Sequence, residues 1–105
     1  MKPRPSAVIA MNDLTAVGVI KALHQEGLRV PQDVSVVGFD RTQLAQCLIP
    51  SLTTVDMHAE LLGQTAADAL HELCTSTKGE GKEYCMPLEL VIGESTGPVP
   101  KTSEL

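Results

Sequence analysis

Polar residues that could bind a hydroxylated ligand follow two short, largely apolar runs of this sequence. Asn12 and Asp13 come directly after residues 7–11, and Asp40 comes directly after residues 34–39. A carboxylate accepts hydrogen bonds and a carboxamide both donates and accepts them, so Asp40 and Asn12 suit the hydroxyl groups of a ligand. Helix capping is the alternative role for all three residues, because short polar side chains accept hydrogen bonds from the first N–H groups of a helix.

One five-residue pattern could carry catalysis, but its surroundings do not support that role. Residues 93–97 match the G-x-S-x-G turn that presents the nucleophilic serine of many hydrolases. That mechanism needs a helix after Ser95 and a histidine base later in the chain. Here Pro98 and Pro100 follow, and the last histidine is His71. The sequence therefore predicts a turn at the end of a strand, and it predicts that the protein is not an enzyme.

The histidines and cysteines do not form a metal-binding pattern. The three histidines share no ligand spacing, and Thr75 stands where the His71-Glu72 pair would need a second histidine. The three cysteines contain no C-x-x-C pair, which argues against a disulfide framework or a thiolate zinc site and favours a reducing compartment. The residues concerned are His24, His58, His71, Cys47, Cys74 and Cys85. The sequence predicts neither a metal nor a cofactor.

The size and charge of the chain exclude several classes of protein. Its 105 residues suffice for one domain and not for two. Eight basic residues against thirteen acidic ones give a net charge of −5, and the basic residues are scattered, whereas a DNA-binding surface needs clustered cations. Phe39 and Tyr84 are the only aromatic residues, which excludes a base-stacking platform. The apolar run at 7–11 is too short for a signal peptide or a membrane span, so we expect a cytoplasmic protein.

Alternating strands and helices must position these polar residues. Apolar runs predict parallel strands near 7–11, 34–39 and 87–92, with an extended segment at 52–55. Helical spacing of apolar residues predicts helices near 13–26, 42–48 and 58–75. The continuous first run predicts a strand covered on both faces, and the alternating last one predicts a strand with one face less buried. The fold class is therefore α/β with a parallel sheet, in which ligands bind beyond the carboxyl ends of the strands.

Four motifs along the chain together resemble one protein family. They are AVIAMNDLTAVG at 7–18, GLRVPQDVSVVGFD at 27–40, PSLTTV at 50–55 and LELVIGES at 88–95. In this order and at this spacing they resemble the lactose/galactose-repressor (LacI/GalR) family of bacterial transcription regulators. The expected boundaries are a disordered lead at 1–5, part of the effector-binding and dimerisation domain at 6–97, and a tail at 98–105.

The resemblance implies a fold and a function. LacI/GalR regulators join a helix-turn-helix that binds operator DNA to a two-lobed, periplasmic-binding-protein-like (type I) core that binds a small effector and dimerises. This chain resembles mainly the C-terminal lobe of that core. It is expected to be a fragment of a repressor that changes its operator affinity on binding a sugar-like or nucleoside-like ligand, with operator DNA bound only through a headpiece absent from this chain. A fragment of a periplasmic-type sugar-binding protein is the alternative.

The resemblance also implies roles for individual residues. Asp40 matches the carboxylate that binds effector hydroxyls, and Asn12 matches a neighbouring polar contact. Ala59 departs from the aromatic or polar contact common at this place, which leaves the effector open. The expected homodimer interface consists of Val17, Ile20, Lys21, Cys47 and Leu48. Without the other lobe, the apolar stripe of the third helix should be exposed, and the chain should self-associate, swap elements or be only marginally folded; this stripe is Leu62, Ala66, Ala69, Leu70 and Leu73.

Overall fold

The computed structural model describes residues 3–77 and 79–101. Its elements in chain order are β1 (Ala7–Ile9), α1 (Asp13–Gln25), β2 (Ser35–Val37), α2 (Gln43–Cys47), β3 (Thr54–Asp56), α3 (Ala59–Thr75) and β4 (Glu89–Val91). All three predicted helices are confirmed to within one residue at each end, and each predicted strand contains a shorter observed one. Residues 1–2 of the expected lead and 102–105 of the expected tail lie outside the described residues.

The predicted β-α-β unit is present. β1 pairs with β2 in parallel, with Val8 opposite Val36, and α1 connects the two strands. A parallel bridge between Val37 and Thr53 brings the segment that leads into β3 alongside β2. The carboxyl ends of β1, β2 and β3 therefore point the same way, and the polar residues that follow β1 and β2 meet at one edge.

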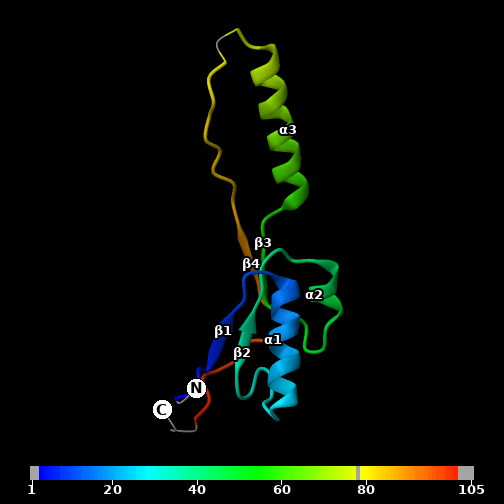
Figure 1. The fold of residues 1–105 in the computed structure, drawn as a ribbon, viewed down its shortest axis with the longest axis vertical. Helices are drawn as coiled ribbons and strands as arrows, with labels where there is room; N and C mark the ends of the chain where they lie inside the picture. The colour runs from blue at the N-terminus through cyan, green and yellow to red at the C-terminus, as the bar shows by residue number, and fades with distance from the viewer. Residues whose placement is uncertain (1–2, 78, 102–105) are drawn as a thin grey trace.

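The last strand does not run in the predicted direction. β4 pairs with β3 in antiparallel, with Thr54 opposite Val91 and Asp56 opposite Glu89. Figure 1 shows the reason: α3 extends away from the sheet, and the segment 79–88 returns beside it. The chain therefore re-enters next to β3 from the opposite side. A parallel arrangement would require the connection to cross back over the sheet before the strand begins.

The hydrophobic core lies on one face of the parallel strands. Its buried members are Ala10, Ala16, Val36, Ala45 and Leu52, and the partly buried Val19, Ile20, Leu23, Val30 and Leu48 pack against them. The prediction that β1 is covered on both faces is wrong, because side chains alternate along a strand and only one face meets α1. On the opposite face, Ile9 and Met11 are 82% and 80% exposed.

α1 has the boundaries that its end residues dictate. Asn12 precedes it in an extended conformation, and its side chain accepts a hydrogen bond from the Thr15 N–H at 2.8 Å. After the helix, Gly27 has a φ of +75°, a left-handed conformation that glycine adopts without steric penalty. Asn12 thus takes the capping role that its sequence position allows, and a glycine follows the end of the helix.

The third helix and the segment that returns from it form an arm, which we define as residues 59–88 without residue 78. Figure 1 shows this arm extending from the rest of the chain, which we call the body. α3 contains no buried residue, and Leu70 of the predicted apolar stripe is 62% exposed. Leu88, Leu90 and Ile92 on and beside β4 are also exposed, so the face of β4 that carries the leucines is open. None of the helices in the described ranges is long and apolar enough to span a bilayer.

Candidate functional site

The segments that follow β1 and β2 lie side by side. The backbone N–H of Asp13 donates to the carbonyl of Phe39 at 2.9 Å, and the N–H of Asp40 donates to the carbonyl of Val55 at 3.0 Å. The first bond joins the end of β1 to the end of β2, and the second joins the end of β2 to β3. The structure thus brings the segments of Asn12 and Asp40 together at the edge where ligands bind in parallel α/β sheets.

Two consecutive residues at this edge have backbone conformations that are rare outside glycine. Asp40 has a φ of 112° and Arg41 a φ of 53°. Three successive N–H groups hold them in place: that of Asp40 on Val55, that of Arg41 on the Thr54 hydroxyl at 3.2 Å, and that of Thr42 on the Asp13 carboxylate at 2.7 Å. Such strain persists only where the surroundings enforce it, and it clusters at ligand-binding sites.

The side chain of Asp40 is half-buried, and it makes no hydrogen bond or ion pair among the residues that the structure describes. The capping alternative is wrong for Asp40, because Thr42 caps α2 by accepting from the N–H of Ala45. Both carboxylate oxygens of Asp40 are therefore available as acceptors for the hydroxyl groups of a ligand.

Asn12 combines the two roles that its sequence position suggested. Its Oδ1 caps α1 through the N–H of Thr15. Its Nδ2 group has no partner in residues 3–77 and 79–101, so it can still donate hydrogen bonds. The capping alternative is confirmed for Asn12, and its side chain keeps a donor on the segment that lies next to that of Asp40.

Asp13 positions the site, and sequence reasoning missed this role. The side chain is fully buried inside the first turn of α1. Its Oδ1 accepts from the Thr54 hydroxyl at 2.6 Å, and its Oδ2 accepts from the N–H and hydroxyl of Thr42 at 2.7 and 2.9 Å. One carboxylate therefore joins α1, the start of α2 and β3. No local signal could reveal this, because the partners are 29 and 41 positions away.

Ser95 is a structural residue and not a nucleophile. It is fully buried, its hydroxyl donates to the carbonyl of Val36 at 2.5 Å, and its Oγ accepts from the N–H of Thr53 at 2.8 Å. A hydroxyl engaged on both sides and closed off from solvent cannot attack a substrate. The G-x-S-x-G pattern therefore marks the place where the chain crosses beside β2.

A second polar group lies where β3 passes into α3. Asp56 accepts from the guanidinium of Arg41 at 2.9 Å and from the backbone N–H of His58 at 2.8 Å. These hydrogen bonds, the His58 N–H first and Arg41 second, hold the pKa of Asp56 below its usual value. The imidazole of His58 lies between two carboxylates, with Nδ1 3.6 Å from Asp56 and Nε2 3.8 Å from Glu89.

Four of the five expected interface residues line one hollow on the body. This hollow, of about 710 Å³, lies between α1, the turn after it and the segment after α2. Val17, Ile20, Lys21 and Leu48 belong to its lining, whereas Cys47 is exposed outside it. Ile20 and Leu48 also pack against the core, so their apolar character has a structural cause within the chain as well.

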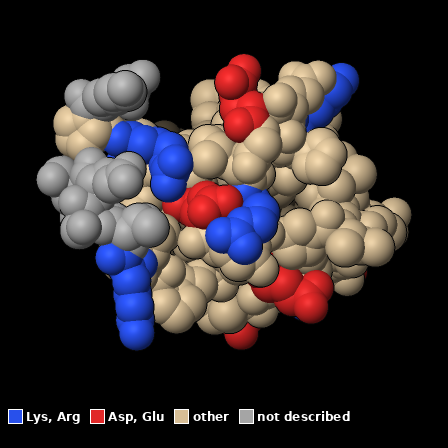
Figure 2. Space-filling model, turned by 90° about the horizontal axis from the view of Figure 1, so that it is seen from below, with Lys and Arg blue, Asp and Glu red and all other residues tan. Residues whose placement is uncertain are grey.

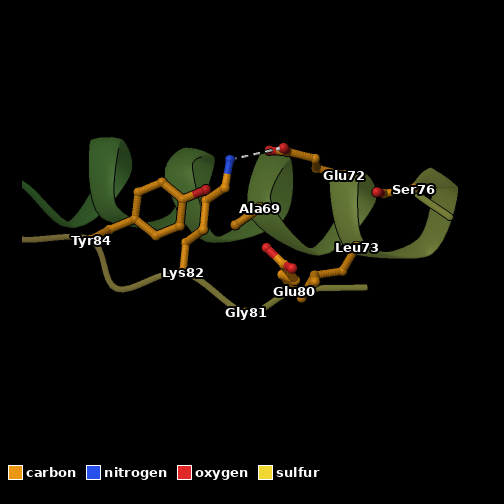
Figure 3. Close-up of a pocket in the computed structure, with 8 residues that line it drawn as sticks. All are labelled: Ala69, Glu72, Leu73, Ser76, Glu80, Gly81, Lys82 and Tyr84. Carbon is orange, nitrogen blue, oxygen red and sulfur yellow. Dashed lines mark hydrogen bonds and ion pairs between the residues drawn. The ribbon is translucent and has the colours of Figure 1, made fainter. Parts of the chain in front are cut away.

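The hollow on the arm is smaller and lacks a buried polar group. It has a volume of about 300 Å³ between α3 and the returning segment, and Figure 3 shows its lining. Lys82 reaches across to Glu72 at 3.2 Å, and this hydrogen bond raises the pKa of Lys82. Both partners are exposed, and the pair bridges α3 and the returning segment (Figure 3).

One face of the body carries cations and anions side by side (Figure 2). Figure 2 shows the end of the body farthest from α3, where Lys and Arg side chains are interspersed with Asp and Glu among the described residues. Arg29, for example, forms an ion pair with Asp33, in which the Nε atom of Arg29 lies 3.1 Å from the Oδ2 atom of Asp33. A phosphate-binding surface requires cations that are clustered and free of such partners.

Comparisons with known proteins agree on one family. The model of the periplasmic binding protein-like domain matches residues 1–96. The HTH-type transcriptional repressor PurR of Photobacterium profundum is 40% identical over 90% of this chain, and the lactose operon repressor of Escherichia coli is 40% identical over 88% of it. The chain spans 28% and 25% of these two relatives. The crystal structure of a lac repressor dimer bound to operator and the anti-inducer ONPF matches 88% of the chain with a TM-score of 0.80.

Proposed function

Because this chain belongs to the periplasmic binding protein-like domain family and is homologous to the LacI and PurR repressors, we propose that it is the effector-binding and dimerisation part of a transcriptional repressor. The relatives are transcriptional repressors and not enzymes. In this proposal the chain acts in the cytoplasm, performs no catalysis, and influences DNA only through a headpiece beyond these residues. Its task is to bind a small molecule and to change the affinity of that headpiece for operator DNA.

The observation that carries the proposal is the free carboxylate of Asp40 on a strained backbone. Asp40 would accept hydrogen bonds from two hydroxyl groups of the effector, and the Nδ2 group of Asn12 would donate a further one. A ligand rich in hydroxyls, such as a sugar or a nucleoside, matches this set. A structure of a LacI family regulator from Arthrobacter in complex with lactose, 33% identical to this chain, is one relative whose ligand has this chemistry.

The hydrogen bonds around Asp40 offer a route from ligand to switch. Asp40 is followed by Arg41 and Thr42, and Thr42 is bound to Asp13 at the start of α1. Asp13 is also bound to Thr54 on β3, which leads into α3. A ligand that shifts the backbone at Asp40 would therefore act on α1, α2 and β3 together. Such a ligand changes operator affinity only if this network has two arrangements and the ligand binds one of them more tightly than the other.

The proposed homodimer uses α1 and the segment of α2. Val17, Ile20, Lys21 and Leu48 line a largely apolar hollow, and Cys47 lies next to Leu48 in sequence. A second copy would fill this hollow and cover the apolar groups there, as an interface core requires. In a repressor with two headpieces, such a dimer would match the two half-sites of an operator.

A chimera tests this proposal directly. The matched segment of the E. coli lactose operon repressor would be replaced by this chain, and repression of a reporter with the lac operator would be measured with a panel of monosaccharides and nucleosides. We expect repression, and its relief by one class of ligand. Asp40→Ala should raise the ligand concentration needed for relief by about 5- to 150-fold while repression persists, because leaving one partner of a hydrogen bond unpaired costs about 1–3 kcal/mol.

Asp33→Ala is the matched control, since Asp33 is a carboxylate of the same body engaged in a surface ion pair. It should leave both repression and relief unchanged. A chimera that represses and responds equally well with Asp40→Ala contradicts the effector site. A chimera that is folded but monomeric in sedimentation contradicts the dimer.

A further inference from the structure

Two carboxylates face each other across the junction between body and arm. Asp56 at the end of β3 and Glu89 at the start of β4 are direct partners in the antiparallel register. Like charges in directly opposite positions destabilise a strand pair. The two strands are only three residues long each, so a repulsive pair at one end affects a large share of the ladder.

The charges of this cluster are not balanced by the chain itself. Arg41 binds Asp56 at 2.9 Å and compensates one of the two negative charges. His58 is the remaining basic group of the cluster, and its imidazole lies 3.6 Å from Asp56 and 3.8 Å from Glu89. The carboxylate of Glu89 therefore has no Lys or Arg partner among the described residues and lies beside an imidazole nitrogen, a pair of ligand types that a divalent metal ion accepts.

The geometry of the three side chains fits one metal ion. Asp56, His58 and Glu89 each offer one ligand atom, and these atoms lie within 4.8 Å of one another. Two ligands about 2.1 Å from a zinc ion at a tetrahedral angle are about 3.4 Å apart. The 3.6 Å separation from Asp56 is measured at Nδ1 and the 3.8 Å separation from Glu89 at Nε2, and an imidazole gives an ion only one of these nitrogens. The three atoms that one ion would use lie within 4.8 Å of one another, so rotation of the side chains must close the remaining distance.

An ion has access to the cluster. Asp56 and His58 line a surface hollow of about 560 Å³ together with the first two turns of α3. The side chains of Asp56, His58 and Glu89 are 16%, 36% and 62% exposed. His58 is also held in place by its backbone, which has a φ of 50° and donates to Asp56 at 2.8 Å.

We propose that Asp56, His58 and Glu89 form a binding site for a divalent transition-metal ion such as Zn²⁺, with water completing the coordination. One imidazole and two carboxylates are ligands that zinc accepts in proteins. The ion would join the β3–α3 junction to β4 and so fix the direction of the arm relative to the body. The site uses no atom of Asp40 or Asn12, so it stands or falls independently of effector binding.

The separation of the ligands explains why sequence reasoning found no metal pattern. Asp56 and His58 are two positions apart, but the third ligand reaches them only through the pairing of β3 with β4. His58 is the histidine that belongs to this cluster.

Calorimetric titration of the 105-residue chain with Zn²⁺ tests the proposal. The three exposed cysteines would first be alkylated, since thiolates bind zinc on their own. We expect one ion per chain, and at least about tenfold weaker binding after His58→Asn or Glu89→Gln. Asparagine tolerates the left-handed conformation of residue 58, so His58→Asn removes the imidazole with little backbone strain.

The controls are His71→Asn and Glu72→Gln, which change the same residue types on the exposed arm and should bind Zn²⁺ like the parent chain. Circular dichroism establishes that each variant is folded; if His58→Asn is not, Glu89→Gln on the exposed face of β4 decides. With Co²⁺ in place of Zn²⁺, a visible absorption band that is lost in the same two variants is expected. Absence of binding by the folded parent chain, or binding unaffected by both ligand variants, overturns the proposal.

Discussion

The body and the arm differ in how polar groups hold them together. In the body, the buried carboxylate of Asp13 and the buried hydroxyl of Ser95 each join segments that are distant in sequence. In the arm, the structure describes an exposed ion pair between Lys82 and Glu72 and a helix without a buried residue. The body therefore has the packing of a folded unit, whereas the apolar face of the arm is exposed to solvent.

The two long helices show what amphipathic spacing predicts and what it leaves open. Both α1 and α3 carry apolar residues at helical spacing, and both form as predicted. In α1 that face meets the core, with Ala16 fully buried. In α3 the corresponding face remains exposed. Periodicity thus specifies a helix with one apolar face, but the element that covers this face has to be supplied by tertiary structure.

Replacing Asp13 should have the largest effect on stability. Asp13→Ala leaves the Thr54 hydroxyl and both donors of Thr42 without their acceptor. The unsatisfied buried donor of Thr54 costs about 1–3 kcal/mol, whereas water can reach the exposed Thr42. We therefore expect a loss of about 3 kcal/mol in urea unfolding followed by circular dichroism. Asp68→Ala on the arm, where Asp68 accepts from Gln64 on an exposed face, should change the free energy of unfolding by less than about 0.5 kcal/mol. Equal effects of the two variants would contradict the distinction between body and arm.

Two glycines should respond to the same substitution with opposite signs. At Gly38 an added Cβ would meet the Asp13 carboxylate and lie 2.7 Å from Leu52 Cδ2, so Gly38→Ala should destabilise the chain by about 1–3 kcal/mol. At Gly63 in α3 an added Cβ meets nothing within 4 Å, so Gly63→Ala should stabilise the helix by about 0.5–1 kcal/mol. Thermal unfolding measures both. A stabilising Gly38→Ala would show that the packing around Asp13 is looser than described.

Sequence-based prediction succeeds where the interacting residues are close in sequence and fails where they are far apart. The helices and the cap at Asn12 depend on neighbours within a few positions, and the structure contains them. The carboxyl ends of parallel strands lie at one edge of a sheet, and this also predicted that the segments of Asn12 and Asp40 would meet. For Asp13 the sequence suggested only a local capping role. Its actual partners, Thr42 and Thr54, are too far away in sequence to be recognised from neighbouring residues.

The same reasoning explains the wrong direction of β4. The alternation of Leu88, Leu90 and Ile92 identifies a strand, but direction depends on how the chain returns from α3. That path is a property of the whole connection and leaves no periodic signal in residues 87–92. The cluster of Asp56, His58 and Glu89 escaped prediction for the same reason, since pairing of β3 with β4 creates it.

Charged substitutions on the open face of α3 should alter association more than stability. Leu70 and Leu73 are 62% and 41% exposed, and each leucine gains roughly 1.5–3 kcal/mol when a second surface covers it. We expect the parent chain to self-associate in sedimentation, and Leu70→Lys with Leu73→Lys to shift it toward the monomer. Ala67→Lys is the control for added charge on the same exposed helix. A parent chain that sediments as a monomer would show that the apolar face of the arm tolerates solvent.

Body and arm each carry an exposed ion pair, and the two pairs differ in the number of hydrogen bonds. Asp33 accepts from the backbone N–H of Arg29 at 2.7 Å and from its guanidinium at 3.1 and 3.3 Å. Lys82 makes a single contact with Glu72, at 3.2 Å. The hydrogen bonds from the Arg29 side chain lower the pKa of Asp33, and the hydrogen bond to Glu72 raises the pKa of Lys82.

These opposite shifts give the smallest effects, with opposite dependence on pH. Since the pKa of Asp33 is lower in the folded chain than its ordinary value of 3.8, its contribution is complete above that value and disappears as the pH falls through the folded pKa. Since the pKa of Lys82 lies above its ordinary value of 10.5, its contribution is complete below that value and disappears as the pH rises through the folded pKa. In carboxyl titrations by NMR, Arg29→Ala should move the pKa of Asp33 up only part of the way to 3.8, because the backbone N–H of residue 29 still donates to it. Full recovery of the ordinary value would show that the guanidinium alone causes the shift, and that the body's pair is no better organised than the single contact of the arm.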